Sequence, residues 1–403
     1  MTVFMNRTAV KKAFMLILAI FFIPIASGCW NRRELNTLGI LGSVAVDMED
    51  EKYKLTFEII KPKPAGGKGG GGANEEPVKI IQSIGDSFFE ALRNATLKFD
   101  RRIFMPHTKV YIFSEEAARK GLIDLIDFLK RDHETRMSTY VVIAKGSSAA
   151  EVLNTAGGIE DIPSNYIVRL IEGQRFNSKA LAIKLRDLLK YYYDKGKQPA
   201  IGIIQKKKKP KESSTKKSET EYELSVEGSA VFLEEKLVGF IDGKETRGFN
   251  FVIGKMKSGI IVSPAPKGKG NNTIEIMEAK SKNDVKIEGN KAKIKVKISL
   301  TGMLGEESAK INIKESGVIE KIEKANSQEV KNEIEGVIRK VQKEYETDIF
   351  GFGEVLHKGH PSQWKKVQDN WNEIFSHAEV KVEVETKITR VGLTNTPVNK
   401  KEE

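Results

Sequence analysis

The 403-residue sequence contains one cysteine and five histidines, which argues against disulfides and against a zinc site. A lone cysteine cannot form a disulfide within the chain, so stability has to come from packing. His357 and His360 lie three residues apart, but a zinc site needs two or more further ligands at suitable spacing, and only His377 is near. We therefore expect no metal and no cofactor, and we place these histidines in exposed loops.

The sequence also lacks the motifs of common enzyme sites. The "GDS" at Gly85–Ser87 has no Asp-x-x-His late in the chain to complete a lipase site, so we place Ser87 in the first turn of a helix. The glycine-rich stretch before Pro77 fails as a phosphate-binding loop, because Lys68 is followed by Gly69 and not by Ser or Thr. "GFGEVL" ends in Leu356 where a dinucleotide fingerprint needs glycine. We predict that the protein is not an enzyme.

The apolar run near the N-terminus is too short to span a membrane. Residues 13–25 are apolar, whereas a helix needs about 20 residues to cross a hydrocarbon core, and Pro24 breaks the helix near its end. Three basic residues precede the run, namely Arg7, Lys11 and Lys12. Three small residues follow it, namely Ala26, Ser27 and Gly28. This order predicts a secretory signal peptide over residues 1–28 and argues against a permanent transmembrane anchor.

The single cysteine directly follows that signal peptide. Cleavage between Gly28 and Cys29 would leave Cys29 at the mature N-terminus, and "ASGC" resembles the lipobox of bacterial lipoproteins, although Ala26 stands where leucine is usual. We therefore predict an S-diacylglycerol on the Cys29 sulfur, with the newly exposed amino group as a second acylation position. Membrane lipid is then a partner through Cys29, and Arg32 and Arg33 would lie against the headgroups. The alternative is a buried, unmodified thiol.

The net charge of +12 indicates either an anionic partner or a structural role for the lysines. Nucleic acid is excluded as a working partner, because an exported, lipid-tethered chain does not meet it. Anionic membrane or wall polymer remains as a partner. The simpler explanation is that lysines keep the exposed faces of strands soluble.

The first part of the chain alternates strands and helices, which predicts an N-terminal α+β domain over residues 29–205. We expect a strand over residues 53–59, a helix over 83–98, a strand over 109–113 that leads into a helix capped by Ser114, and a helix over 122–130. A strand over 138–146, a helix opened by Ser147 and a helix over 178–196 follow.

A charged stretch separates this domain from the rest. Residues 206–220 have almost no large apolar side chains and are predicted to form a basic linker. A small middle β domain is expected over residues 221–282. It would contain a hairpin of Ala230–Leu233 with Leu237–Ile241 and two strands, over residues 259–262 and 273–278.

The last part, residues 283–396, predicts a C-terminal α+β domain. Four lysines alternate with apolar residues from Lys291 to Ile298, which indicates a strand with one wet face. A long helix follows, with apolar positions from Val330 to Tyr345, and then a helix with an aromatic stripe, Trp364, Trp371 and Phe375. We interpret that stripe as core and expect a final strand over 379–388. The fold class is α+β: three domains with antiparallel or mixed sheets covered by helices.

Three groups of residues resemble the Ger(x)C family, the lipoprotein C-subunits of spore germinant receptors. The first group is Cys29, Trp30 and Arg33–Leu35, and the second is the hairpin region with Leu237, Gly239, Glu245, Thr246, Arg247 and Gly248. The third is Asp348, Phe350-Gly351-Phe352-Gly353, Pro361, Trp364, Trp371 and Phe375. The glycine-rich insert at 66–72 and the polylysine stretch depart from the family pattern.

The resemblance implies three α+β domains on a lipid anchor at the outer face of the spore inner membrane. It also implies two integral-membrane partners, the A- and B-type receptor subunits, in a receptor that responds to small nutrients. The family has no known catalytic residues, and recognition of the germinant is usually placed in the B-subunit. The chain is therefore expected to serve assembly and signalling. Two alternatives remain: a lipoprotein that captures a solute for a transporter, and a tethered envelope hydrolase that uses Ser87 or His360.

Overall fold

The computed structural model describes most of the chain. The described residues are 8, 11–18, 37–61, 76–193, 195–209, 221–267, 269–289, 291–309, 312–313 and 315–391. The predicted cleavage and acylation site, Gly28 and Cys29, lies outside them, as does the glycine-rich insert. Residues 11–18 are helical, and no helix in the described ranges is both long and apolar enough to cross a bilayer.

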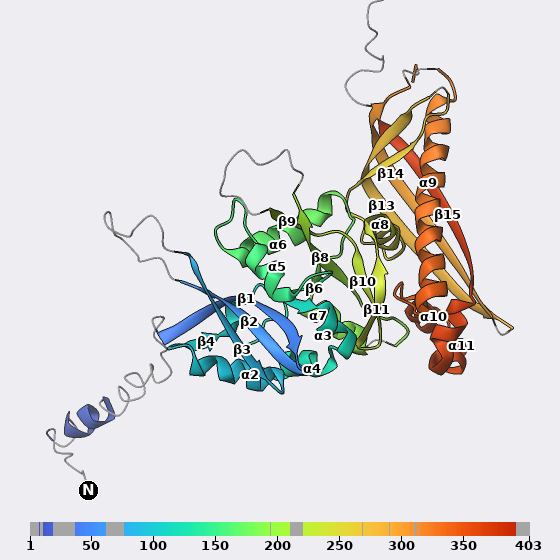
Figure 1. Cartoon of the computed structure of the whole chain (residues 1–403). Coiled ribbons are helices and arrows are strands. Elements are labelled where there is room, and N and C mark those ends of the chain that lie inside the picture. Colours follow the sequence, from blue (N-terminus) through green and yellow to red (C-terminus); the bar gives the residue numbers. More distant parts are fainter. Residues whose placement is uncertain are drawn as a thin grey trace, which may run out of the picture.

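A mixed sheet forms the N-terminal body (Figure 1). Its main path runs β11-β10-β8-β6-β5-β1-β2-β3, with β4, β7 and β9 paired at its sides. The central strands β1, β5, β6 and β8 are parallel, and the strands at both edges are antiparallel. The strands are β1 (Leu38–Glu49), β2 (Lys52–Ile60), β3 (Val78–Gly85), β4 (Arg102–Phe104), β5 (Val110–Ser114), β6 (Tyr140–Ala144), β7 (Ile183–Lys184), β8 (Ala200–Lys208), β9 (Tyr222–Ser225), β10 (Ser229–Leu233) and β11 (Lys236–Ile241).

Helices cover both faces of this sheet, because the parallel strands are apolar on both sides. Tyr111 and Phe113 of β5 pack in the cluster that contains α2, α3, α4 and α7, whereas Val110 and Ile112 pack with α5 and α6. The helices are α2 (Phe88–Asn94), α3 (Glu115–Lys120), α4 (Ile123–Arg131), α5 (Ala149–Thr155), α6 (Pro163–Gly173) and α7 (Leu185–Tyr193), with short 3-10 turns η2 (Ala95–Leu97), η3 (Met105–His107) and η4 (Gln174–Phe176).

A second sheet, of order β12-β13-β14-β15, forms the C-terminal body. The long helix α9 lies along it, and Figure 1 shows this body on the opposite side of the molecule from β4. The strands are β12 (Ile260–Pro264), β13 (Asn271–Glu288), β14 (Lys291–Glu307) and β15 (Glu379–Arg390). The helices are α8 (Gly243–Val252), α9 (Val318–Lys340), the π-helical turn η5 (Val341–Tyr345), α10 (Phe352–Gly359), α11 (Pro361–Val367), the 3-10 turn η6 (Gln368–Asn370) and α12 (Trp371–Ser376).

The α+β class, the helix-covered sheets and the long C-terminal helix are confirmed. The predicted hairpin is β10–β11, and Ser114 caps α3 by accepting a hydrogen bond from the Ala117 N–H. The lysines of β14 alternate with buried Ile294, Val296 and Ile298, as the pattern predicted.

Several boundaries were wrong. The helix expected over 178–196 is only α7, because residues 183–184 form a strand that pairs with β6. Ser148 and not Ser147 caps α5. The aromatic helix is three short pieces, α11, η6 and α12, and the helices α6 and α8 were not predicted.

The segment predicted as a middle β domain contributes to both sheets. Its hairpin pairs with β8 of the first sheet through β10, whereas β12 and β13 pair within the second sheet. The boundaries expected at 205/206 and 282/283 fall inside β8 and β13, so Lys206, Lys207 and Lys208 are strand residues and not linker. One apolar cluster runs through both bodies. The number of independently folding domains stays a prediction.

Candidate functional site

The candidate site is a junction between the two bodies of the described chain. It is built where two segments meet, residues 195–199 after α7 and residues 347–353 after η5. The Gln198 N–H donates to the Asp348 carbonyl oxygen at 2.8 Å, and the Glu354 N–H donates to the Gly196 carbonyl oxygen at 3.1 Å. These two backbone bonds tie the bodies together at a place where few side chains intervene.

Glycine allows this close approach. Gly196 has φ +84°, and a Cβ there would lie 2.7 Å from the Gly353 carbonyl carbon. A Cβ on Gly353 would lie 2.6 Å from the Trp371 Nε1. A side chain at either position would push the two segments apart, so the glycines are required by packing.

Asp348 organises the junction from a fully buried position. Its Oδ1 accepts a hydrogen bond from the Gly351 N–H at 2.9 Å, and its Oδ2 accepts from the Gly353 N–H at 2.8 Å and the Trp371 Nε1–H at 2.9 Å. Burial raises the pKa of Asp348 to about 6, and the three donors and the charge of Lys197 oppose that rise. The carboxyl therefore holds a turn and an indole in place and is sealed from solvent.

The aromatic residues of the same motif form the core beside Asp348. The Phe350 ring centroid lies 5.3 Å from that of Phe352 and 5.5 Å from that of Phe249 on α8. Trp364 and Trp371 meet edge to face at 5.7 Å and are only 2% and 3% exposed. The prediction that the tryptophan stripe is core is confirmed, although its residues lie on two short helices, α11 and α12, separated by η6.

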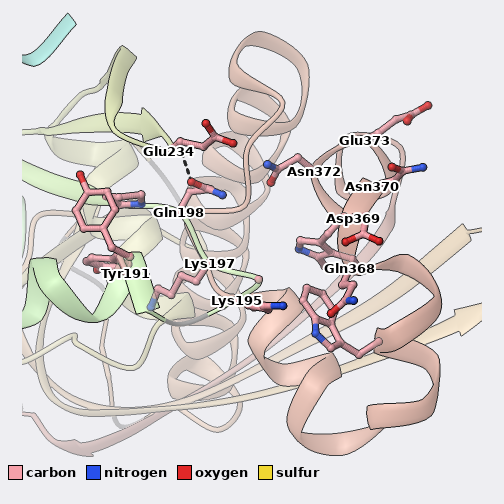
Figure 2. Close-up of a pocket in the computed structure, with 15 residues that line it drawn as sticks. Tyr191, Lys195, Lys197, Gln198, Glu234, Gln368, Asp369, Asn370, Asn372 and Glu373 are labelled. Atoms are coloured by element: carbon pink, nitrogen blue, oxygen red, sulfur yellow. Dashed lines mark hydrogen bonds between the residues drawn. The ribbon is translucent and has the colours of Figure 1, made fainter. Parts of the chain in front are cut away.

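A cavity of about 510 Å³ opens next to these rings. Figure 2 shows its walls: Tyr191, Lys195, Lys197 and Gln198 come from the N-terminal body, and Asp369 and Asn370 from the C-terminal body. The Glu234 N–H donates to the Gln198 Oε1 at 2.8 Å on one wall. Charges of both signs and several amides line the space, so it suits water or a small polar molecule, and the lining offers no nucleophile held by a base.

A second contact between the bodies involves the hairpin and η5. The Tyr345 hydroxyl donates to the Phe240 carbonyl oxygen at 2.8 Å and accepts from the Phe240 N–H at 3.2 Å. A Cβ on Gly239 would lie 2.2 Å from the Tyr345 ring. Gly239 therefore leaves space for the Tyr345 side chain, whose hydroxyl satisfies the backbone N–H and carbonyl oxygen of Phe240 in β11.

A buried ion pair joins α8 to α9. Arg247 and Glu333 are both buried and form a bidentate pair, with the Arg247 Nε 2.9 Å from the Glu333 Oε2. The Arg247 Nη1 also donates to the Ile260 carbonyl oxygen of β12 at 2.7 Å. A Cβ on Gly248 would lie 2.7 Å from the Glu333 carbonyl oxygen, so the helices touch through glycine.

The role of this helix was missed from the sequence, although a signal was present. Asp242 and Glu245 form a capping box, in which the Asp242 side chain accepts from the Glu245 N–H and the Glu245 side chain accepts from the Asp242 N–H. An Asp-x-x-Glu pair ahead of "TRGFNFV" indicates a helix start. It would have identified α8 as the element that carries Arg247 to α9.

The other candidate residues from the sequence that the structure describes do not contact the Asp348 carboxyl. Ser87 caps α2 by accepting from the Glu90 N–H. His357 lies within α10 and not in a loop as expected, and its ring centroid is 5.7 Å from that of Trp364 with the planes tilted by 31°. His360 lies between α10 and α11. Within the described ranges no group of three His, Cys, Asp or Glu side chains is placed to hold a metal ion.

Comparison with known proteins gives matches over most of the chain. Residues 31–206 match the family "Spore germination protein N-terminal domain", and residues 227–392 match "Spore germination B3/ GerAC like, C-terminal". Two similar proteins of Bacillus subtilis (strain 168) are "Spore germination protein KC", 29% identical over 96% of this chain and 98% of its own length, and "Spore germination protein B3", 26% identical over 96% and 99%.

One solved structure shares the fold. The crystal structure of the GerBC protein matches with a TM-score of 0.56 and covers 86% of this chain and 96% of its own. At 22% sequence identity this likeness concerns the fold alone.

Proposed function

Because this chain belongs to the GerC family of spore germination proteins, we propose that it is a non-enzymatic, lipid-anchored subunit of a nutrient-germinant receptor, required for receptor assembly and signalling. The observation that carries the proposal is the family match over both bodies, from residue 31 to residue 392. The motif residues support a non-enzymatic role, because Asp348, Arg247 and Gly239 are all engaged in holding elements together. Asp348, Arg247 and Gly239 thus serve to join the two sheets.

The anchor in this proposal is a diacylglycerol on Cys29 after cleavage at Gly28. Two acyl chains hold a protein at a bilayer where one chain holds it only marginally. The proposed location is the outer face of the spore inner membrane, and the proposed partners are the integral-membrane A- and B-type subunits. The chain then presents a folded body, joined through its N-terminus, beside those subunits.

Co-purification from spores tests the function. The tagged chain is expected to bring A- and B-type membrane subunits with it after mild detergent extraction, because assembly is its proposed role. Mass spectrometry of the eluate identifies the partners, and an unrelated spore lipoprotein with the same tag is the control. Recovery of the chain alone under conditions that keep other receptors intact would speak against a receptor subunit.

The Cys29→Ala variant tests the anchor. It is expected to lose all acyl labelling, because no other cysteine can take the thioether, and to lower the germination response sharply. Metabolic labelling with a fatty-acid analogue and the loss of spore optical density measure the two effects. Cys29→Ser is the matched control for side-chain size. Normal germination in spores that carry no label would show that the lipid is dispensable.

The cavity at the junction favours a second candidate, capture of a small polar solute for a transport system. Its volume of about 510 Å³ and its mixed charges suit a polar molecule of modest size. Calorimetric titration of the purified chain with nutrient mixtures separates the two functions. Tight binding by the chain alone would favour solute capture, and binding only within the assembled complex would favour the receptor subunit.

A further inference from the structure

The end of the N-terminal sheet where β1 begins carries a basic hollow. A space of about 340 Å³ has an apolar floor that includes Leu38, Ile59 and Phe99. Lys61, Lys79 and Arg101 stand around it. The apolar floor and the cationic rim thus lie together at one end of the sheet, where β1 starts at Leu38.

The cations of this end are available for an external partner. Exposed Lys98 directly precedes Phe99 in the chain, and among the described residues no ion pair engages Lys61, Lys79, Lys98 or Arg101. Lys79 lies with its Nζ 5.4 Å above the Phe99 ring, an arrangement that holds the ammonium at the rim. Asp100 is the one acidic residue in the lining of the hollow. The hollow as a whole is therefore positive.

An exposed leucine precedes Lys98 in the chain, two residues before Phe99 of the hollow's floor. Leu97 is the last residue of η2 and is 82% exposed. Lys98 follows it, and Phe99, two residues on, is buried. An exposed large apolar side chain near a basic surface is typical of proteins that meet lipid, where the apolar group enters the interface and the cations contact phosphates.

The length of chain that precedes β1 restricts where a bilayer can lie. Eight residues, 30–37, lie between Cys29 and Leu38. The nine Cα–Cα steps from Cys29 to Leu38 span at most about 3.6 Å each, or roughly 30 Å in all. If Cys29 is anchored as proposed above, the start of β1 lies within that distance of the headgroups. Figure 1 shows the C-terminal sheet on the far side of the molecule from this end.

We propose that the hollow around Lys61, Lys79 and Arg101, together with Leu97, is a bilayer-facing surface that binds anionic phospholipid headgroups. The cations contact lipid phosphates, Leu97 enters the interface, and the C-terminal sheet points away from the membrane. The inference rests on the proposed function for the anchor at Cys29. It adds an orientation: one defined end of the N-terminal sheet lies on the lipid.

A fluorescence experiment on the full acylated chain tests this orientation. The only native thiol is the proposed acylation site, so Leu97→Cys supplies a single residue for a fluorescent label. The labelled protein is reconstituted in phosphatidylglycerol-rich vesicles that contain nitroxide-labelled lipid, which quenches only nearby fluorophores. Ile260→Cys is the matched control, because Ile260 is an exposed apolar residue, at 51%, on β12 of the C-terminal sheet.

We expect strong quenching at position 97 and little at position 260. Replacing Lys61, Lys79 and Arg101 by glutamine is expected to reduce the quenching at position 97 toward the control level while the acyl chains keep the protein on the vesicles. Each cation near an anionic surface favours the docked state by roughly fivefold. Vesicles of phosphatidylcholine alone should give the same reduction.

Three outcomes would overturn the proposal. The vesicle-bound protein could show no quenching at position 97, or equal quenching at both positions. It could also show quenching at position 97 that is unchanged when Lys61, Lys79 and Arg101 are replaced by glutamine. In each of these the anchor proposal survives, because the protein still floats with the vesicles. A wild-type chain that does not float with vesicles overturns the anchor and the bilayer-facing surface together.

Discussion

Asp348→Ala is expected to lower the free energy of unfolding by about 3–5 kcal/mol, because it leaves three buried N–H donors without an acceptor. The donors belong to Gly351, Gly353 and the Trp371 indole, so the turn and the aromatic cluster loosen together. Urea unfolding followed by tryptophan fluorescence measures the change. The midpoint should fall, and the fluorescence of the native state should shift because Trp371 is no longer held.

Trp371→Phe is the matched control for this variant. It removes one donor and keeps an aromatic ring in the cluster, so it should cost clearly less than Asp348→Ala. If both variants unfold at the same urea concentration, the carboxyl does not organise the junction and the aromatic packing alone determines the stability.

The pH dependence provides a second readout of the same carboxyl. Its pKa in the folded state is about 6, above the ordinary value of 3.8, so the folded protein binds more protons than the unfolded chain between these values. The contribution of Asp348 to stability is therefore fully present below about pH 4 and is lost as pH rises through 6. Relative to Asp348→Asn, the wild type should lose about 3 kcal/mol over that window. A difference that does not change with pH would mean that the carboxyl stays ionised in the fold.

The second large effect is expected at the ion pair between α8 and α9. Arg247→Met should destabilise the protein by about 3–5 kcal/mol, because it leaves the Glu333 carboxylate buried without its partner. The same change also removes the hydrogen bond to the Ile260 carbonyl oxygen. Urea unfolding measures the loss, and circular dichroism checks that the fold is retained before denaturant is added.

A double variant separates the charge from the packing. Arg247→Met combined with Glu333→Leu removes both charges and should recover much of the stability lost in the single variant, since buried ion pairs are often replaceable by apolar residues. Lys244→Met is the control for an exposed cation at the same place, because Lys244 pairs with Glu329 at 2.6 Å and lies only 4.0 Å from Glu333; it should cost clearly less than Arg247→Met. A double variant no more stable than Arg247→Met would show that the arginine acts through its bond to β12.

The sequence allowed the fold class and much of the C-terminal body to be predicted, because the signals there are periodic. Alternating lysines identified β14, and the spacing of Val330, Ile334 and Val337 identified α9. The hairpin β10–β11 followed from two apolar runs around a short turn. The tryptophans were assigned to the core from helical spacing, which burial confirms.

What the sequence could not provide was the partner of each element. The hairpin could be recognised locally, but its pairing with β8 depends on a non-local contact that leaves no pattern in either strand. The same holds for Asp348, whose donors come from its own turn and from Trp371, 23 residues away. Strand boundaries inside charged stretches were also missed, because Lys206–Lys208 read as solvated chain although they pair with β9.

The path of the chain between the two sheets has a mechanical consequence. The hairpin is hydrogen-bonded into one sheet, α8 follows after a single residue, and its arginine is bonded to both α9 and the edge strand of the other sheet. This stretch contains no flexible linker that would let the two sheets rotate independently. A load applied to the C-terminal sheet is therefore transmitted to the N-terminal sheet, and the two sheets move together as one body.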